Sequence, residues 1–138
     1  ATSQKAVIDT EIEGIPGEMV IPPEYISNSM ERMRIYRKLA TASTVEAIED
    51  IRKELEDRFG KAPEQVVRLI NLFKIRVSAF ARNVKKISYK DGVLKILCSK
   101  GVRIDLKRRH VFNERYPIYI IYDVHDEEVY RVLADIFL

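Results

Sequence analysis

The sequence predicts an α+β fold in which an N-terminal helical half of three helices precedes a small, mainly antiparallel sheet and a C-terminal helix. Two observations support this prediction. Hydrophobic residues recur every three or four positions up to about residue 83 and at every second position after it, which marks a change from helical to strand periodicity. The 138 residues are 46% hydrophobic and 33% charged, a composition typical of one folded globular domain.

Residues 1–24 are expected to form a short strand and an extended connector, and residues 25–138 a single domain. Residues 7–13 alternate between apolar and polar side chains, as in a strand. Glycines and prolines, which interrupt regular structure, then crowd the segment that follows. They are Gly14, Pro16, Gly17, Pro22 and Pro23. The chain begins with Ala1 rather than methionine, so we expect it to be a fragment of a longer protein.

The first helix should begin near Ser27 or Asn28, which are both good N-terminal caps. Apolar residues at helical spacing predict its inward face. They are Ile26, Met30, Met33, Tyr36 and Ala40. The second helix opens with Ser43 and Glu46 at the spacing of a capping box and should end at Gly60.

The third helix should take Pro63 in its first turn and end at Asn83, because asparagine tolerates the left-handed conformation. Its inward stripe is predicted to contain seven residues. They are Val66, Leu69, Ile70, Phe73, Val77, Phe80 and Ala81. The whole helical half is thus defined by caps and by apolar spacing.

Four strands are expected after residue 83. Residues 84–89 and 93–98 flank Asp91 and Gly92, a strong signal for a two-residue hairpin turn. Residues 102–107 alternate cleanly, and residues 118–122 read as a further, more buried strand. Residues 126–137 predict the closing helix. Its inward residues are Val129, Val132, Leu133, Ile136 and Phe137.

The second predicted helix is strongly acidic. Residues 44–57 contain six carboxylates against Arg52 and Lys53. The six are Glu46, Glu49, Asp50, Glu54, Glu56 and Asp57. On a helical wheel they lie opposite an apolar stripe of Ile48, Ile51, Leu55 and Phe59. The last three acids lie near the C-terminal end, where the helix dipole disfavours carboxylates. We interpret this cluster as a surface for an external basic partner, although a solvated helix surface would show the same pattern.

The second half of the chain is basic instead. Residues 82–115 contain eleven lysines and arginines against three acids. Residues 106–116 place four of these cations with His110 beside Phe112 and Tyr116, a mixture that suits phosphate contacts and base stacking. A solvated strand edge, on which lysine and arginine discourage association between edges, explains the same residues and is the preferred reading.

No motif for catalysis is found. Gly60 and Lys61 resemble the end of a phosphate-binding loop, but Leu55 stands where the first glycine should be and Ala62 where serine or threonine must hold the metal. Neither a nucleophile elbow nor a glycine-rich dinucleotide loop is present. We therefore expect that this chain is not an enzyme and binds no nucleotide cofactor.

Metal binding and membrane insertion are not expected either. His110 and His125 lie apart, without the spacing of metal ligands. Cys98 is the only cysteine, which leaves no internal disulfide and fits a reducing compartment. No stretch approaches the length of apolar chain that spans a membrane, and no signal peptide is visible. These features favour a cytoplasmic location.

Three segments in order carry a resemblance to a known family. They are residues 21–26 (IPPEYI), 32–40 (RMRIYRKLA) and 54–63 (ELEDRFGKAP). Together they resemble the C-terminal domain of bacterial transcription-repair coupling factors. From about residue 84 the likeness weakens, because Asn83-Val84 replaces the family's Gly-Ile and residues 99–117 lack the helix that the family has between strands.

The resemblance implies a parent protein that acts in transcription-coupled nucleotide excision repair as an ATP-dependent DNA translocase. ATP and Mg would then bind in a motor upstream of this chain, to which residues 1–24 would connect. The domain itself is not catalytic in that family and needs no cofactor. Its implied role is regulatory and autoinhibitory: it docks on the N-terminal repair-recruitment domain of the same chain. Docking masks the surface that binds the damage-recognition ATPase of the Uvr system.

The resemblance implies that the acidic residues with which the family contacts its N-terminal domain correspond to Glu54 and Asp57. The acidic helix adds Arg58, Asp50 and Glu46 to the predicted partner-binding residues. RNA polymerase and the repair ATPase would be indirect partners, and direct DNA binding is not expected. The alternative reading is a DNA- or RNA polymerase-binding module that uses the basic sheet half, and a structural cap on the motor is a third.

Overall fold

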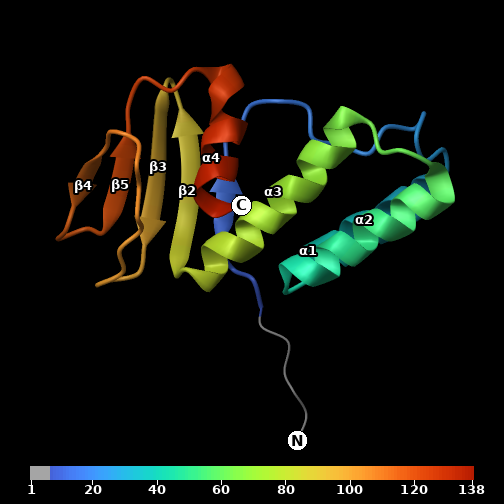
Figure 1. Cartoon of the computed structure of the whole chain (residues 1–138), viewed down its shortest axis with the longest axis horizontal. Helices are drawn as coiled ribbons and strands as arrows, with labels where there is room; N and C mark the ends of the chain where they lie inside the picture. Colours follow the sequence, from blue (N-terminus) through green and yellow to red (C-terminus); the bar gives the residue numbers. More distant parts are fainter. Residues whose placement is uncertain (1–6) are drawn as a thin grey trace, which may run out of the picture. The chain divides into compact units, whose positions relative to one another are not determined.

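A computed structural model describes residues 7–138, so the first six residues of the predicted connector lie outside the described residues. Four α-helices and five strands make up an α+β fold with a C-terminal helix, which confirms the predicted class (Figure 1). The described chain divides into a helical unit (residues 7–8 and 18–77) and a sheet unit (residues 9–17 and 78–138). The predicted domain boundary at residue 24 stays a prediction.

The helical unit contains α1 (Ser29–Thr41), α2 (Val45–Phe59) and most of α3 (Glu64–Ala81). Its largest buried side chains come from all three helices and from the segment before them. They include Ile26, Ile35, Leu39, Ile48, Leu55, Ile70 and Ile75. The phenol of Tyr25 donates a hydrogen bond to the carbonyl of Gly60 at 2.7 Å. This bond attaches the proline-rich segment to the end of α2.

Most helix ends agree with the prediction. The Asn28 side chain caps α1 by accepting a hydrogen bond from the Glu31 amide at 3.0 Å. α2 ends before Gly60 as predicted, and Gly60 has a positive φ of 85°, which favours glycine, although its ψ of −172° is not that of a left-handed helical residue. Asn83 follows α3 with a φ of 62°. The cap of α2 was predicted one residue early, because the Thr44 hydroxyl accepts the bond from the Ala47 amide and Ser43 does not.

The inward face of α1 was predicted wrongly. Ile35 and Leu39 are buried, whereas Met30 is 72% exposed and Met33 is 49% exposed. Both sets have helical spacing, so the pattern alone does not decide between them. Predicted stripe residues elsewhere are also less buried than expected: Phe59 is only half-buried. The same holds for Phe73 and Phe80, while Ala81 is exposed.

The sheet unit is a five-stranded sheet in the order β1-β2-β3-β5-β4. Its strands are β1 (Glu11–Glu13), β2 (Val84–Lys90), β3 (Val93–Cys98), β4 (Val111–Asn113) and β5 (Ile118–Ile121). Only β1 runs parallel to its neighbour, so the sheet is mainly antiparallel, as predicted. Asp91 and Gly92 form the predicted hairpin turn, with φ values of 48° and 81°.

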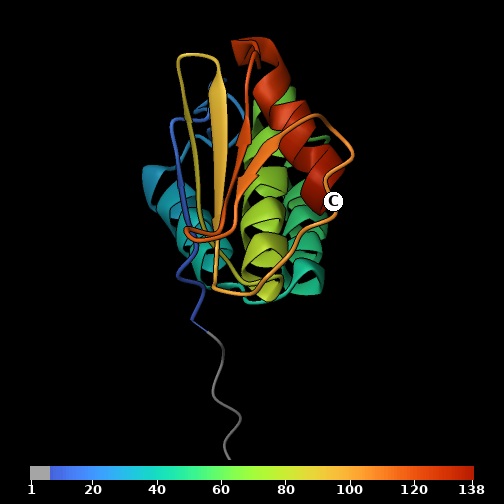
Figure 2. The same cartoon turned by 90° about the vertical axis from the view of Figure 1, so that its left-hand side faces the viewer.

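A short 3₁₀ turn η1 (Asp126–Glu128) leads into α4 (Val129–Phe137), as the sequence predicted for residues 126–137. Figure 2 shows α4 beside one face of the sheet. Four of its predicted inward residues are buried: Val129, Val132, Leu133 and Phe137. The Ser78 hydroxyl donates to the carbonyl of Phe137 at 2.7 Å, which ties α4 to the last turn of α3 within this unit.

The strand predicted at residues 102–107 is not formed. The segment is irregular, although Ile104 and Leu106 are buried as their alternation suggested. The Ile104 amide donates to the Tyr119 hydroxyl at 2.8 Å instead of to a neighbouring strand. A strand forms a few residues later in the chain instead, at β4. In residues 7–138 no helix is both long and apolar enough to cross a membrane.

Candidate partner-binding surface

Helix α2 presents its six carboxylates in two groups. The apolar side of the helix is anchored by Ile48, Ile51 and Leu55, which are all buried. The carboxylates lie around the remaining circumference, where cations of α2 itself, of α1 and of α3 can reach some of them. Among residues 7–138, salt bridges divide them into three paired acids and three unpaired acids. The paired acids are Glu49, Glu54 and Glu56, and the unpaired acids are Glu46, Asp50 and Asp57.

Two of the paired acids are held by Arg52. Its guanidinium contacts Glu49 and lies 2.6 Å from an Oε1 of Glu56, at the i, i+3 and i, i+4 spacings that place side chains on one helix face. Lys74 on α3 adds a second contact to Glu49, with 2.5 Å between Nζ and Oε2. The hydrogen bonds from Arg52 and then Lys74 lower the pKa of Glu49 from 4.5 to about 2.

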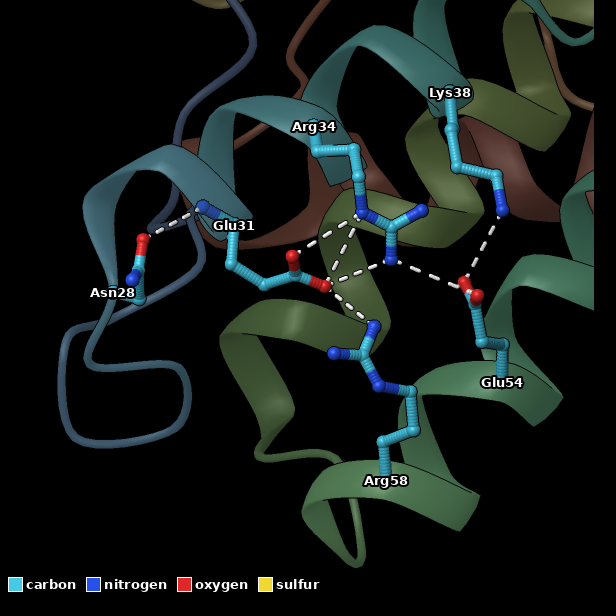
Figure 3. Close-up of polar contacts among 6 residues, drawn as sticks. All are labelled: Asn28, Glu31, Arg34, Lys38, Glu54 and Arg58. Atoms are coloured by element: carbon cyan, nitrogen blue, oxygen red, sulfur yellow. Dashed lines mark hydrogen bonds and ion pairs between the residues drawn. The ribbon is translucent and has the colours of Figure 1, made fainter.

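The third paired acid, Glu54, belongs to an ion-pair cluster between α1 and α2 (Figure 3). Its carboxylate lies 3.2 Å from Lys38 Nζ and 3.6 Å from Arg34 Nη2. Glu31 lies at the centre of the cluster, 2.7 Å from Arg34 and 2.5 Å from Arg58. The hydrogen bonds from Arg34 and then Arg58 lower the pKa of Glu31 from 4.5 to about 2. The cluster therefore binds the two helices to each other.

The three unpaired acids form a stripe on the exposed side of α2. Glu46, Asp50 and Asp57 are all exposed, and none makes a salt bridge within residues 7–138. At about 100° per residue they fall within roughly 40° of one another around the helix. Asp57 lies in the last turn, where the dipole disfavours it, and Lys53, one turn before it on the same face, forms no salt bridge with it. We call these three residues the unpaired acidic stripe.

The structure therefore separates the five predicted partner-binding residues. Glu46, Asp50 and Asp57 share the unpaired acidic stripe, whereas Glu54 and Arg58 are engaged in the ion-pair cluster. The helical wheel places Glu54 opposite the apolar stripe, which predicts a side chain that is free to contact a partner. That expectation changes, because Glu54 already has two cationic neighbours.

Sequence reasoning did not identify the rest of the cluster. The i, i+3 spacing of Glu31 and Arg34 was a visible signal for one of its pairs. The contact between Arg58 and Glu31 joins residues 27 positions apart, and no local pattern indicates it. Only the packing of α1 against α2 brings these two side chains together.

The basic sheet half is less available than its charge suggests. Arg103 pairs with Glu114 at 2.8 Å, and its guanidinium also lies 4.2 Å from the centre of the Phe112 ring. That ring packs against Tyr119, with 4.5 Å between ring centres. Phe112 is therefore occupied by its own domain. Tyr116 remains 62% exposed and could contact a partner.

Other cations of this half remain exposed. Lys107 and Arg109 form no salt bridge with any described residue. Arg108, in contrast, lies 3.3 Å from Glu128. Lys107 and Arg109, together with the exposed Tyr116, are the residues that keep a nucleic-acid interface open as an alternative.

No arrangement suited to a metal or a reactive thiol stands out. Within residues 7–138 no group of three or more histidine, cysteine, aspartate or glutamate side chains is placed to hold a metal ion. His110 Nδ1 lies 2.7 Å from the carbonyl of Arg108. Cys98 is buried, and burial raises the pKa of its thiol, which suits a packing role.

The described residues thus form an α+β domain with an exposed acidic surface on α2. The sequence model of the TRCF domain family matches residues 15–109, a span that includes α1, α2 and the unpaired acidic stripe. The chain therefore belongs to the TRCF domain family, and its resemblance to the C-terminal domain of transcription-repair coupling factors is confirmed.

Individual relatives agree with this assignment. A transcription-repair-coupling factor of Staphylococcus epidermidis is 31% identical over 110 residues, which cover 80% of this chain and 9% of the relative. A transcription-repair-coupling factor of Staphylococcus aureus is 32% identical over 98 residues, which cover 71% of this chain and 8% of that relative. The chain thus spans less than a tenth of these relatives' length.

A solved structure supports the fold. The crystal structure of the C-terminal domain of a transcription-repair coupling factor superposes with a TM-score of 0.75. The match covers 93% of this chain and 90% of that domain at 22% sequence identity.

Proposed function

We propose that this chain is a non-catalytic docking domain of a transcription-repair coupling factor. In this proposal it acts as an autoinhibitory lid: it docks on the N-terminal repair-recruitment domain of its parent protein and masks the surface for the damage-recognition ATPase. RNA polymerase would be only an indirect partner. The chain itself would bind neither ATP nor Mg, which belong to the motor of the parent translocase.

The observation that carries the proposal is the unpaired acidic stripe. Among the acids of α2, Glu49, Glu54 and Glu56 form salt bridges, whereas Glu46, Asp50 and Asp57 form none within residues 7–138, although Lys53 shares their face of the helix. Three exposed carboxylates on one face repel one another, and Asp57 also opposes the helix dipole. A basic surface on a partner domain would relieve both unfavourable terms. Asp57 belongs to the segment that carries the family resemblance.

The expected interface is weak, as a switch requires. Each exposed ion pair contributes about 0.2–1 kcal/mol, so three pairs with their apolar surroundings would give a few kcal/mol. Covalent linkage within one parent chain would supply an effective concentration on the order of millimolar. A modest conformational change in the parent could then release the lid.

Calorimetry with the N-terminal repair-recruitment domain tests the proposal. The 138-residue chain should bind it, and the Asp50→Arg/Asp57→Arg variant should bind at least about tenfold more weakly, because two attractions become repulsions. Asp135→Arg is the matched control, since Asp135 is also exposed and also lies two residues before the end of its helix. Equal affinities of the unmodified 138-residue chain and of the double variant for the N-terminal domain would refute docking through this stripe.

A DNA- or RNA polymerase-binding module remains the second candidate, supported by Lys107, Arg109 and the exposed Tyr116. Titration with duplex DNA across a salt series separates the two functions. Binding that weakens steeply with salt and is lost in Lys107→Glu/Arg109→Glu would favour the module. The lid proposal predicts no DNA binding at about 100 mM salt, where only a substantial phosphate-binding surface would still be occupied.

A further inference from the structure

Helix α1 exposes a stripe that docking through α2 does not use. Met30 is 72% exposed and Met33 is 49% exposed. With Arg34 and Arg37 they occupy positions i, i+3, i+4 and i+7, which places the four side chains on one face of the helix. The outward face of a helix that packs on a core is normally polar, so two large apolar side chains one turn apart indicate a contact surface.

An open groove of about 830 Å³ runs along this stripe. Arg58 and Phe59, at the end of α2, line it together with Met30 and Met33. Phe59 is half-buried, with its ring centre 5.9 Å from that of Tyr25. We call this feature the methionine groove. Its apolar lining comes from two helices, which gives it the two sides that a bound helix requires.

The rim of the methionine groove is basic. Its charged residues are four cations and one carboxylate, namely Arg34, Arg37, Lys38, Arg58 and Glu31. Glu54 lies outside the groove and pairs with two of these cations, but the cations still outnumber the two carboxylates. Arg37 is exposed and makes no salt bridge within the described part of the chain. A bound segment that carries carboxylates would therefore be favoured over a basic one.

We propose that the methionine groove binds an acidic amphipathic helix of a partner polypeptide. Its apolar residues, spaced by three or four positions, would contact Met30, Met33 and Phe59, and its aspartates or glutamates would face the basic rim. The 13 residues of α1 extend for roughly 20 Å, enough to contact about three turns of such a helix. Methionine suits this contact because its flexible thioether adapts to different apolar surfaces.

This inference does not depend on the lid function, because the two surfaces select partners of opposite charge. The unpaired acidic stripe on α2 needs a basic surface, whereas the groove beside α1 needs an acidic one. Refuting one proposal therefore does not refute the other, and variants of the two surfaces can be tested in parallel.

Fluorescence anisotropy with two synthetic helical peptides provides the test. Both peptides carry leucine at every third or fourth position; one has glutamate and the other lysine at the remaining positions. The acidic peptide should bind the 138-residue chain saturably, and added NaCl should weaken that binding. The lysine peptide should not bind. Amide chemical shifts should change along α1 and at the end of α2.

Substitutions in the groove locate the binding site. Met30→Glu/Met33→Glu should weaken binding of the acidic peptide by roughly tenfold or more, because it removes apolar contacts and adds repulsion. Met30→Leu/Met33→Leu should retain binding. Arg37→Glu should weaken it, whereas Arg131→Glu, which reverses an exposed cation on α4, should not.

Three results would overturn the proposal: equal binding of both peptides, a Kd for the acidic peptide weaker than about 1 mM, or binding that the methionine substitutions leave unchanged. Sedimentation of the chain alone is the second measurement. Self-association abolished by Met30→Glu/Met33→Glu would assign the groove to a second copy instead. Displacement of the peptide by duplex DNA would assign it to nucleic acid. The Asp50→Arg/Asp57→Arg variant should bind the acidic peptide at least as tightly as the unmodified 138-residue chain does.

Discussion

The two sets of carboxylates on helix α2 have the same chemistry but different surroundings. Glu49, Glu54 and Glu56 lie where cations of α1, α2 or α3 reach them, and Glu54 bridges to α1 through Lys38. Glu46 and Asp57, on the exposed side of the same helix, form no salt bridge with any of residues 7–138. Salt bridges within α2 and to α1 and α3 therefore divide one acidic run into a structural set and an available set.

The difference shows why a count of charges does not identify an interaction surface. All six acids contribute equally to the net charge of residues 44–57, yet half of them are already neutralised locally. Ion pairs with a partner contribute to binding mainly where the charged side chain has no salt bridge within its own domain. The available acids, rather than the acidic helix as a whole, are therefore the residues to test.

The largest expected effect concerns the anchor that orients both sets. Leu55 is fully buried, so Leu55→Ala should lower the free energy of unfolding by about 2–5 kcal/mol. Phe59 is half-buried, and Phe59→Ala should cost less, about 1–2 kcal/mol. Urea titrations measure both. A larger loss for Phe59→Ala than for Leu55→Ala would mean that the rotation of α2 described above is wrong.

A smaller effect should separate one structural acid from one available acid. Glu54→Arg places a third cation beside Arg34 and Lys38, so it should destabilise the chain by about 1–2 kcal/mol. Asp57→Arg removes no salt bridge among residues 7–138 and suits the helix dipole, so it should change stability by less than about 0.5 kcal/mol. Thermal unfolding of the two single variants decides this. Equal melting temperatures would remove the distinction between the two sets.

Acid should weaken the structural contacts gradually. The pKa values of Glu31 and Glu49 are lowered from 4.5 to about 2 in the folded chain by their arginine and lysine partners. Because the folded pKa values are the lower ones, the stability that these groups contribute is complete above about pH 4.5. It is lost as the pH falls from there to about 2.

Denaturant titrations at several pH values check this dependence. Glu31→Gln/Glu49→Gln should be less stable than the parent chain at pH 6, and its stability should fall less between pH 4.5 and 2. An equally steep fall in the variant would show that these two carboxylates do not account for the acid sensitivity.

Local signals predicted the helix ends but not which face of α1 is buried. Asn28, Gly60 and Asn83 act through their own backbone or nearby amides, so the sequence reveals them. On α1, Met30 and Met33 fit helical spacing as well as Ile35 and Leu39 do. Only the packing of α1 within the helical unit distinguishes the buried pair from the exposed pair.

Tertiary contacts also explain the strand that was predicted but does not form. Residues 102–107 alternate like a strand, and burial of Ile104 and Leu106 follows that alternation. A strand also needs a neighbouring strand with which its backbone forms hydrogen bonds. The Ile104 amide instead donates its hydrogen bond to the Tyr119 hydroxyl. In the same way, the sequence identified all the acids of α2 but could not show that Glu54 already has partners.

The most direct test of the lid proposal measures how tightly the full-length parent protein binds the damage-recognition ATPase. Opening the lid with Asp50→Arg/Asp57→Arg should increase that affinity by about 5- to 150-fold, the range of a coupling free energy of 1–3 kcal/mol. Asp135→Arg should leave the affinity at the parent level. If calorimetry gives the same affinity for the parent protein and the double variant, the unpaired acidic stripe does not hold an inhibitory contact.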